Sequence, residues 1–147
     1  KPTKQRHARL FSAYDGMSPV GTSDLVLDYD PSGRVFDGLR FFCKGIQVDS
    51  AAVSFTEGKY HHLAVVYDDG SVSFYFDGKL VNQEWIPGGD PVVLSRNLLI
   101  GEDAKRGSDE QLHGHVDDLL VYGQALSGDD IAVLATQGAA VLFDLND

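Results

Sequence analysis

The chain has 147 residues, 43% of them hydrophobic, and a formal net charge of −10 from 22 acidic and 12 basic residues. This length and apolar content fit one globular domain with its own core and exclude a disordered chain. The acidic surface would repel a phosphate backbone, which argues against nucleic-acid binding. No apolar run approaches the roughly 18 residues of a membrane span. Residues 1–6 are polar, so any targeting signal is expected to lie upstream or to have been removed.

Apolar and polar residues alternate along the first half of the chain, which predicts short strands. Strands are expected at residues 8–14, 24–30 and 34–43, with shorter pieces at 46–48 and 52–55. Asp15-Gly16 and Pro31-Ser32-Gly33 are turn sequences that end the first two strands. Asp24, Asp28 and Asp30 share one face of their strand, and we interpret that face as solvated. The single cysteine, Cys43, lies in an apolar run and is predicted to be a buried thiol.

The second half continues with strands and contains one helix. Strands are expected at 60–67, at 71–76 and 79–86 around an Asp77-Gly78 turn, and at 97–101 and 112–122. Ser127 is a candidate N-cap, Asp129 and Asp130 suit the first turn of a helix, and Gly138 would end it. A last strand is expected at 139–145. Many short strands with one short helix predict an antiparallel sandwich or barrel.

Three stretches carry a resemblance to a known family. The first comprises residues 62–67 (HLAVVY) and 72–80 (VSFYFDGKL), the second is 98–101 (LLIG), and the third is 112–131, with HGHVDDLLVY and ALS. In this order they resemble the laminin G-like, pentraxin-related domain of the concanavalin A-like lectins and glucanases. The resemblance implies an all-β, antiparallel two-sheet jelly-roll sandwich with one short helix near the C-terminus, formed by residues 1–147 as a single domain.

The tail at 139–147 is similar to the strand that usually opens a domain of this family. Two interpretations remain open. The order of strands is circularly permuted and the tail completes its own sheet, or the chain is cut from a longer protein and the tail serves another unit. In the second case an unpaired sheet edge would favour strand exchange or self-association.

The resemblance implies a non-catalytic domain that binds a glycan or a glycosylated partner at the cell surface or outside the cell. The absence of disulfides suits a secreted bacterial protein. The alternative is a structural or assembly unit with no small ligand. Glycosidases need two carboxylates flanking the bond, and none of the glutamates lies in the paired motif of the related glucanases: Glu57, Glu84, Glu102 and Glu110. We therefore expect no enzyme activity.

Sugar sites use an exposed aromatic ring with polar groups beside it. The predicted ligand-binding residues are Trp85, late in its strand, and Tyr14 with the adjacent Asp15. For Trp85, the alternative is a place in the core or at its rim.

Calcium is the predicted cofactor, because it prefers oxygen ligands converging from loops. By the likeness to pentraxins, the expected ligands are Glu102, Asp103 and Gln111. Asp117 matches an Asp that holds a structural calcium in related sandwiches, and a hydrogen bond to nearby backbone is the alternative for it. Lys105 and Arg106 lie in the same loop, and a salt-bridged loop without metal is the alternative. His113 and His115 share a strand face, but two ligands make a weak zinc site, so we interpret them as surface residues.

Overall fold

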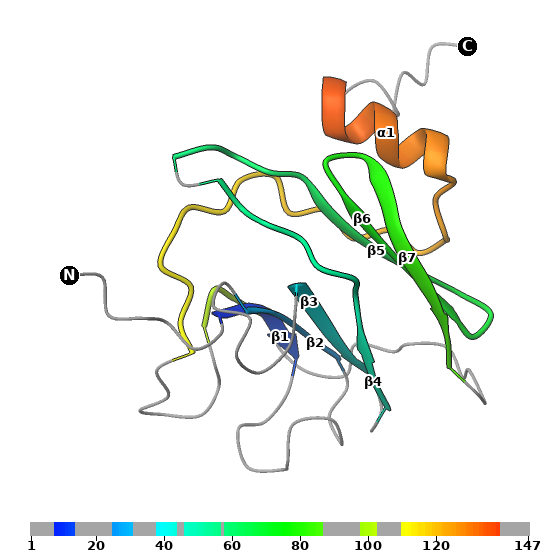
Figure 1. The fold of residues 1–147 in the computed structure, drawn as a ribbon, viewed down its shortest axis with the longest axis horizontal. Helices are drawn as coiled ribbons and strands as arrows, with labels where there is room; N and C mark the ends of the chain where they lie inside the picture. Colours follow the sequence, from blue (N-terminus) through cyan, green and yellow to red (C-terminus); the bar gives the residue numbers. More distant parts are fainter. Residues whose placement is uncertain are drawn as a thin grey trace. The chain divides into compact units, whose positions relative to one another are not determined.

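The computed structural model describes residues 8–13, 25–30, 38–43, 46–56, 58–86, 98–102 and 110–138. The chain forms two compact units, Lys1–Ser54 with Asp90–Leu119, and Phe55–Gly89 with Leu120–Asp147. Each unit contains one antiparallel sheet (Figure 1). Within the described ranges, no helix is long and apolar enough to cross a membrane.

The first unit contains a five-stranded sheet in the order β4-β3-β2-β1-β8. Its strands are β1 (Ala8–Ala13), β2 (Leu25–Asp30), β3 (Gly38–Cys43), β4 (Ile46–Asp49) and β8 (Leu99–Ile100). Alternation places one set of side chains on a common face, where Phe41 pairs in register with Val48 on one side and Leu27 on the other. These three are buried, as is Cys43, which confirms the predicted buried thiol. This face is the apolar core of the unit.

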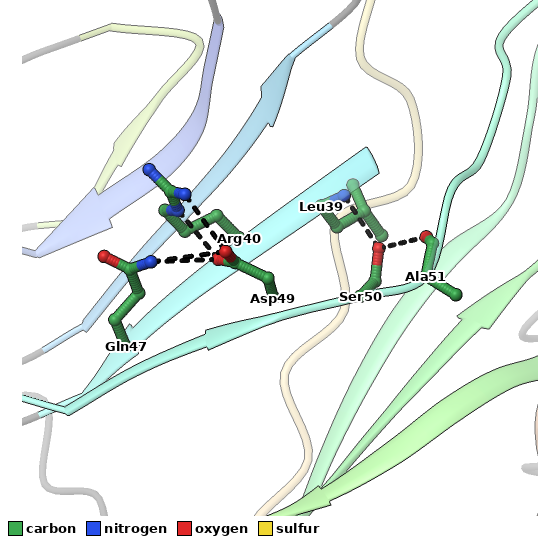
Figure 2. A network of polar contacts seen from close by, with 6 residues as sticks. All are labelled: Leu39, Arg40, Gln47, Asp49, Ser50 and Ala51. Atoms are coloured by element: carbon green, nitrogen blue, oxygen red, sulfur yellow. Dashed lines mark hydrogen bonds and ion pairs between the residues drawn. The ribbon is translucent and has the colours of Figure 1, made fainter. Parts of the chain in front are cut away.

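The opposite face of the same sheet carries charges of alternating sign. Asp49, Arg40, Asp28 and Arg9 lie in register across β4, β3, β2 and β1. Arg40 donates to both carboxylate oxygens of Asp49 at 2.7 and 3.0 Å, and the side-chain amide of Gln47 donates to the same oxygens at 3.3 Å (Figure 2). A bidentate guanidinium–carboxylate pair is the strongest arrangement of this kind.

At its other end the charged row is buried. Arg9 Nε lies 3.0 Å from Asp28 Oδ1, a second guanidinium nitrogen pairs with Glu110, and the Arg9 and Asp28 side chains are 1% and 4% exposed. Asp30 is buried as well. The prediction of a solvated face for Asp28 and Asp30 is therefore wrong. The Arg9 cation stabilises the Asp28 charge out of water. Asp24 lies outside the described residues.

The second unit contains a three-stranded sheet in the order β5-β6-β7, with β5 (Leu63–Asp68), β6 (Ser71–Phe76) and β7 (Lys79–Trp85). β6 and β7 form the predicted hairpin around Asp77 and Gly78. Val72 and Phe74 point to the same face of β6 and are fully buried. Asp77 has a positive φ of 49°, a conformation that Asp tolerates better than most residues.

The single described helix, α1 (Gly128–Gln137), begins and ends where the sequence predicts. Ser127 Oγ accepts from the backbone N–H of Asp130, and the Asp130 carboxylate accepts from the backbone N–H of Ser127, which forms a capping box. The Ser127 hydroxyl, which donates to Asp130 Oδ2 at 2.6 Å, and the Ser127 backbone N–H hold the pKa of Asp130 below its usual value. Ile131 and Leu134 are its buried side chains, and Gly138 is the C-cap.

Two predicted strands are wrong. Residues 52–55 form no strand, and neither do residues 112–122. The N–H of Leu112 donates to Gly101 O at 2.9 Å, but among the described residues no strand pairs with 113–122. Alternating apolar residues form a strand only where a neighbouring strand takes up the backbone hydrogen bonds. The predicted strand at 139–145 lies outside the described residues.

Candidate functional site

The predicted stacking residue Trp85 lies on the surface. It is the last residue of β7 and is 68% exposed, so it is not a core residue. The ring rests on the turn between β5 and β6, because Cη2 and Cζ2 of Trp85 lie 3.2 and 3.3 Å from the position that a Cβ on Gly70 would take. Gly70 has φ +86° and its Cβ position lies 3.0 Å from Ile86 O, so only glycine fits below the indole.

Polar side chains surround this ring on the same face of the sheet. Asp68, Ser71 and Trp85 lie in one register row, and Ser73 and Gln83 lie in the next. Residues in register point to the same face. The side-chain amide of Gln83 donates a hydrogen bond to Ser71 Oγ. We call these five residues the Trp85 face.

Helix α1 lies at the other end of these strands. Atoms of Ala132 and Ala135 lie 3.2 and 2.9 Å from the position that a Cβ on Gly78 would take, in the turn between β6 and β7 (Figure 1). At the first residue of the helix, the Tyr75 hydroxyl lies 3.6 Å from the position that a Cβ on Gly128 would take. The helix thus packs on the Gly78 end of the hairpin, whereas Trp85 lies at the end formed by Gly70.

The structure brings together the two ends of the predicted calcium loop. A backbone hydrogen bond joins Leu112 to Gly101, and Gln111 and Glu102 are the chain neighbours of these two residues. The side chains of Glu102 and Gln111 are both exposed. Asp117 Oδ1 instead accepts from the N–H of Asp118 at 3.1 Å. Nowhere in the described ranges do three or more His, Cys, Asp or Glu residues form a group suited to a metal. Two oxygen-bearing side chains are fewer than calcium needs.

Tyr14, Asp15 and Asp103 lie outside the described residues, so a role for them in ligand or metal binding stays a prediction. His113 and His115 are exposed.

No sequence pattern indicated the hydrogen bonds at the turn between β6 and β7 that we call the clasp, which join Thr56, His61, His62 and Asp77. Thr56 N–H donates to His61 Nε2 at 2.9 Å, so the other ring nitrogen, Nδ1, carries the proton and donates to Asp77 Oδ2 at 2.9 Å. The second oxygen of Asp77 accepts from the His62 N–H at 3.0 Å. The His61 ring also stacks on Phe76, with centroids 5.0 Å apart. From the sequence alone, the adjacent His61 and His62 were expected only to point in opposite directions. Their shared partner, Asp77, lies 16 and 15 residues further along the chain, so no local pattern contains it.

This clasp predicts that the domain is less stable in acid. Burial lowers the pKa of His62, and Asp77 offsets part of that effect. Burial raises the pKa of Asp77, but hydrogen bonds from His61 and His62, with the charge of both rings, leave it below its usual value. The unfolded chain therefore binds more protons at both residues, so stability falls as pH drops below about 6.5 through His62 and below about 3.9 through Asp77.

We expect a lower melting temperature at about pH 5 than at about pH 7, measured by circular dichroism. His62→Gln is expected to reduce this difference. Asp77→Asn, which keeps a residue that tolerates positive φ, is expected to reduce the further loss below about pH 4 and to enlarge the difference between pH 5 and pH 7, because the Asp77 charge no longer raises the pKa of His62. A His62→Gln variant with the unchanged difference between pH 5 and pH 7 would contradict the assignment.

The comparisons with known proteins agree with this architecture. Residues 2–132 match the family model of the concanavalin A-like lectin/glucanases superfamily, in its laminin G form. The chain belongs to this superfamily. No curated protein sequence matches it. A heptameric SAP-like pentraxin from Limulus polyphemus is similar in structure, with a TM-score of 0.70 and 19% identity over 92% of this chain and 66% of that chain.

A second solved structure, the S-layer domain-containing protein (residues 221–444) from Clostridium thermocellum, matches with a TM-score of 0.49 and 25% identity over 76% of this chain and 56% of that chain. The superfamily member described here thus spans two thirds or less of the length of either structure. The likeness to the pentraxin and the two antiparallel sheets confirm the predicted fold class, an all-β jelly-roll sandwich with one short helix.

Proposed function

We propose that this domain is a non-catalytic recognition module that binds a glycan, or a protein that carries one, through the Trp85 face. The observation that carries the proposal is the exposed Trp85 ring, held against Gly70 and bordered by hydrogen-bonding side chains. Membership of a superfamily of lectins and glucanases supports it.

The geometry suits a sugar ring. The apolar face of a pyranose would stack on the indole, and the Ser71 and Gln83 side chains would bind its hydroxyl groups. Because Gly70 supports the benzo ring, Trp85 would lose little side-chain entropy when the ligand binds.

The burial of Asp28 and Asp30 supports a role without catalysis. Asp28 and Asp30 are the closest approach to a catalytic set in the sequence, and each is only 3% exposed. Asp28 is also paired with Arg9. A glycosidase needs two accessible carboxylates, one with a raised pKa. A charge paired with a guanidinium favours the ionised form instead.

We further propose that the module acts outside the cell or at its surface, where glycans are displayed. Calcium assistance through Glu102 and Gln111, with Asp103 and Asp117, is part of the same proposal. It is supported by the meeting of the two loop ends at Gly101 and Leu112.

Trp85→Ala tests the glycan site. We expect glycan affinity to fall about thirtyfold, because removing a stacked indole costs about 2 kcal/mol of binding energy. The measurement is calorimetric titration with the strongest oligosaccharide found on a glycan array.

Tyr60→Ala is the matched control, because Tyr60 is 72% exposed but precedes Leu63, which pairs with Phe76 at the end of the sheet opposite the Trp85 face. Equal affinity of the Trp85→Ala variant and the unchanged protein would refute the site. The same titrations with millimolar calcium and with a chelator test the metal. A chelator that changes neither the affinity nor the melting temperature would remove calcium from the proposal.

A second candidate function, a structural or assembly unit, is favoured by one observation. Each unit exposes two apolar side chains close to the chain boundary between the units: Val116 and Leu119 in the first, at 49% and 42%, and Leu120 and Val121 in the second, at 42% and 68%. Exposed apolar groups in this density favour contact with another surface. Light scattering would then show an oligomer that Val116→Lys and Val121→Lys convert to a monomer. A monomer at every concentration excludes this function.

A further inference from the structure

The Trp85 face has a strongly acidic border. Asp68 lies in the same register row as Trp85, two strands away, which is roughly 10 Å between backbones. Asp69 precedes Gly70, on which the indole rests. Both carboxylates are exposed. Glu84 pairs in register with the buried Val72 and accepts a hydrogen bond from Asn82, so its side chain lies on the opposite face of the sheet and is not part of this border.

The cations of the same unit lie at the other end of its sheet. Its described part contains six carboxylates and two lysines, Lys59 and Lys79. Lys79 begins β7, and Trp85 ends it six residues later, roughly 20 Å away. The backbone N–H of Lys59 bonds to Thr56, whose own N–H bonds to His61 in the clasp at the turn between β6 and β7. Neither lysine is therefore placed to neutralise a ligand on the Trp85 face.

Resting on the proposed glycan-binding function, we infer that the Trp85 face selects neutral or cationic sugars, such as hexose, N-acetylhexosamine or hexosamine units, and rejects uronates and sulfated sugars. A carboxylate on the bound ring would meet two unit charges of its own sign within roughly 10 Å. In water these two repulsions together weaken binding about fourfold at low ionic strength. An amino group at the same place would strengthen binding by a similar factor.

Four proteins and three ligand classes test the inference. The proteins are the unchanged domain, Trp85→Ala, the control Tyr60→Ala, and a variant with Asp68→Asn and Asp69→Asn. Asparagine suits position 69, because Asp69 has φ 42° and Asn adopts this conformation readily. The ligands are a neutral β-glucan oligosaccharide, a chitosan oligosaccharide and an oligogalacturonate, titrated by calorimetry at low and high salt.

We expect the neutral and chitosan ligands to bind in a Trp85-dependent way and the oligogalacturonate to bind at least about fourfold more weakly at low salt. The variant without these carboxylates is expected to recover most of the lost affinity for the oligogalacturonate, and high salt is expected to do the same for the unchanged protein. The affinity of this variant for the neutral glucan should stay unchanged within about twofold.

Two failures have separate meanings. Trp85-dependent binding of oligogalacturonate that is as tight as that of the neutral glucan overturns the selectivity and leaves the glycan site standing. An array and titrations in which no glycan of any charge depends on Trp85 overturn the proposed function, and the selectivity with it.

Discussion

Replacing Arg9 by alanine is expected to lower the free energy of unfolding by about 3–5 kcal/mol, because it leaves Asp28 buried without its cation. Asp28 is 3% exposed, and its Oδ1 lies 3.0 Å from Arg9 Nε. Glu110 would lose its partner at the same time. Urea unfolding followed by fluorescence measures the loss.

Arg40→Ala is the matched control. Arg40 lies in the same register row, but its partner Asp49 is 39% exposed, so the loss is expected to be about 1 kcal/mol or less. A double variant, Arg9→Met with Asp28→Leu, is expected to recover most of the stability, since apolar groups can replace a buried ion pair. If Arg9→Ala lowers the free energy of unfolding by no more than Arg40→Ala does, the conclusion that the Arg9–Asp28 pair is buried is wrong.

Gly38→Ala is expected to cost about 3 kcal/mol. Gly38 has φ +112°, and a Cβ there would lie 2.6 Å from Ala51 O and 2.7 Å from Ser50 Oγ. Ser50 Oγ accepts from the Leu39 N–H at 2.8 Å and donates to Ala51 O at 2.7 Å, and these hydrogen bonds join the start of β3 to the end of β4 (Figure 2). The added methyl group would displace Ser50 and Ala51 and break these hydrogen bonds. Backbone strain and the lost hydrogen bonds both contribute.

Two other glycines separate the cost of the positive φ from the cost of the close contact with neighbouring atoms. Gly58 has φ +76° with no atom within 4 Å of a Cβ, so Gly58→Ala should cost about 1 kcal/mol through conformation alone. Gly123 has neither a positive φ nor a close neighbour, so Gly123→Ala should change stability by less than about 0.5 kcal/mol. Thermal and urea unfolding of the three variants give the order, and a Gly38→Ala variant no worse than Gly58→Ala would contradict the close approach.

The sequence predicted part of the candidate site. The position of Trp85 at the end of a hairpin strand indicated a platform, and its exposure confirms that it is not a core residue. Its support by Gly70 and its register with Asp68 and Ser71 could not be read from the chain, because register couples strands that local patterns describe one at a time. The same holds for the His61–Asp77 clasp, whose members are 16 residues apart.

What the sequence by itself determined was local. Alternating residues and Asp-Gly turns located most of the strands, and Ser127 with Asp130 and Gly138 determined where the helix begins and ends, because capping is a contact between near neighbours. Only the tertiary structure decided which residues are covered. Asp28 looked like a solvated residue and is buried beside Arg9, whereas the apolar Val116 and Val121 looked like strand residues and are exposed. Burial and strand formation depend on partners far along the chain, such as Glu110 for Arg9, 101 residues away, and no local pattern contains them.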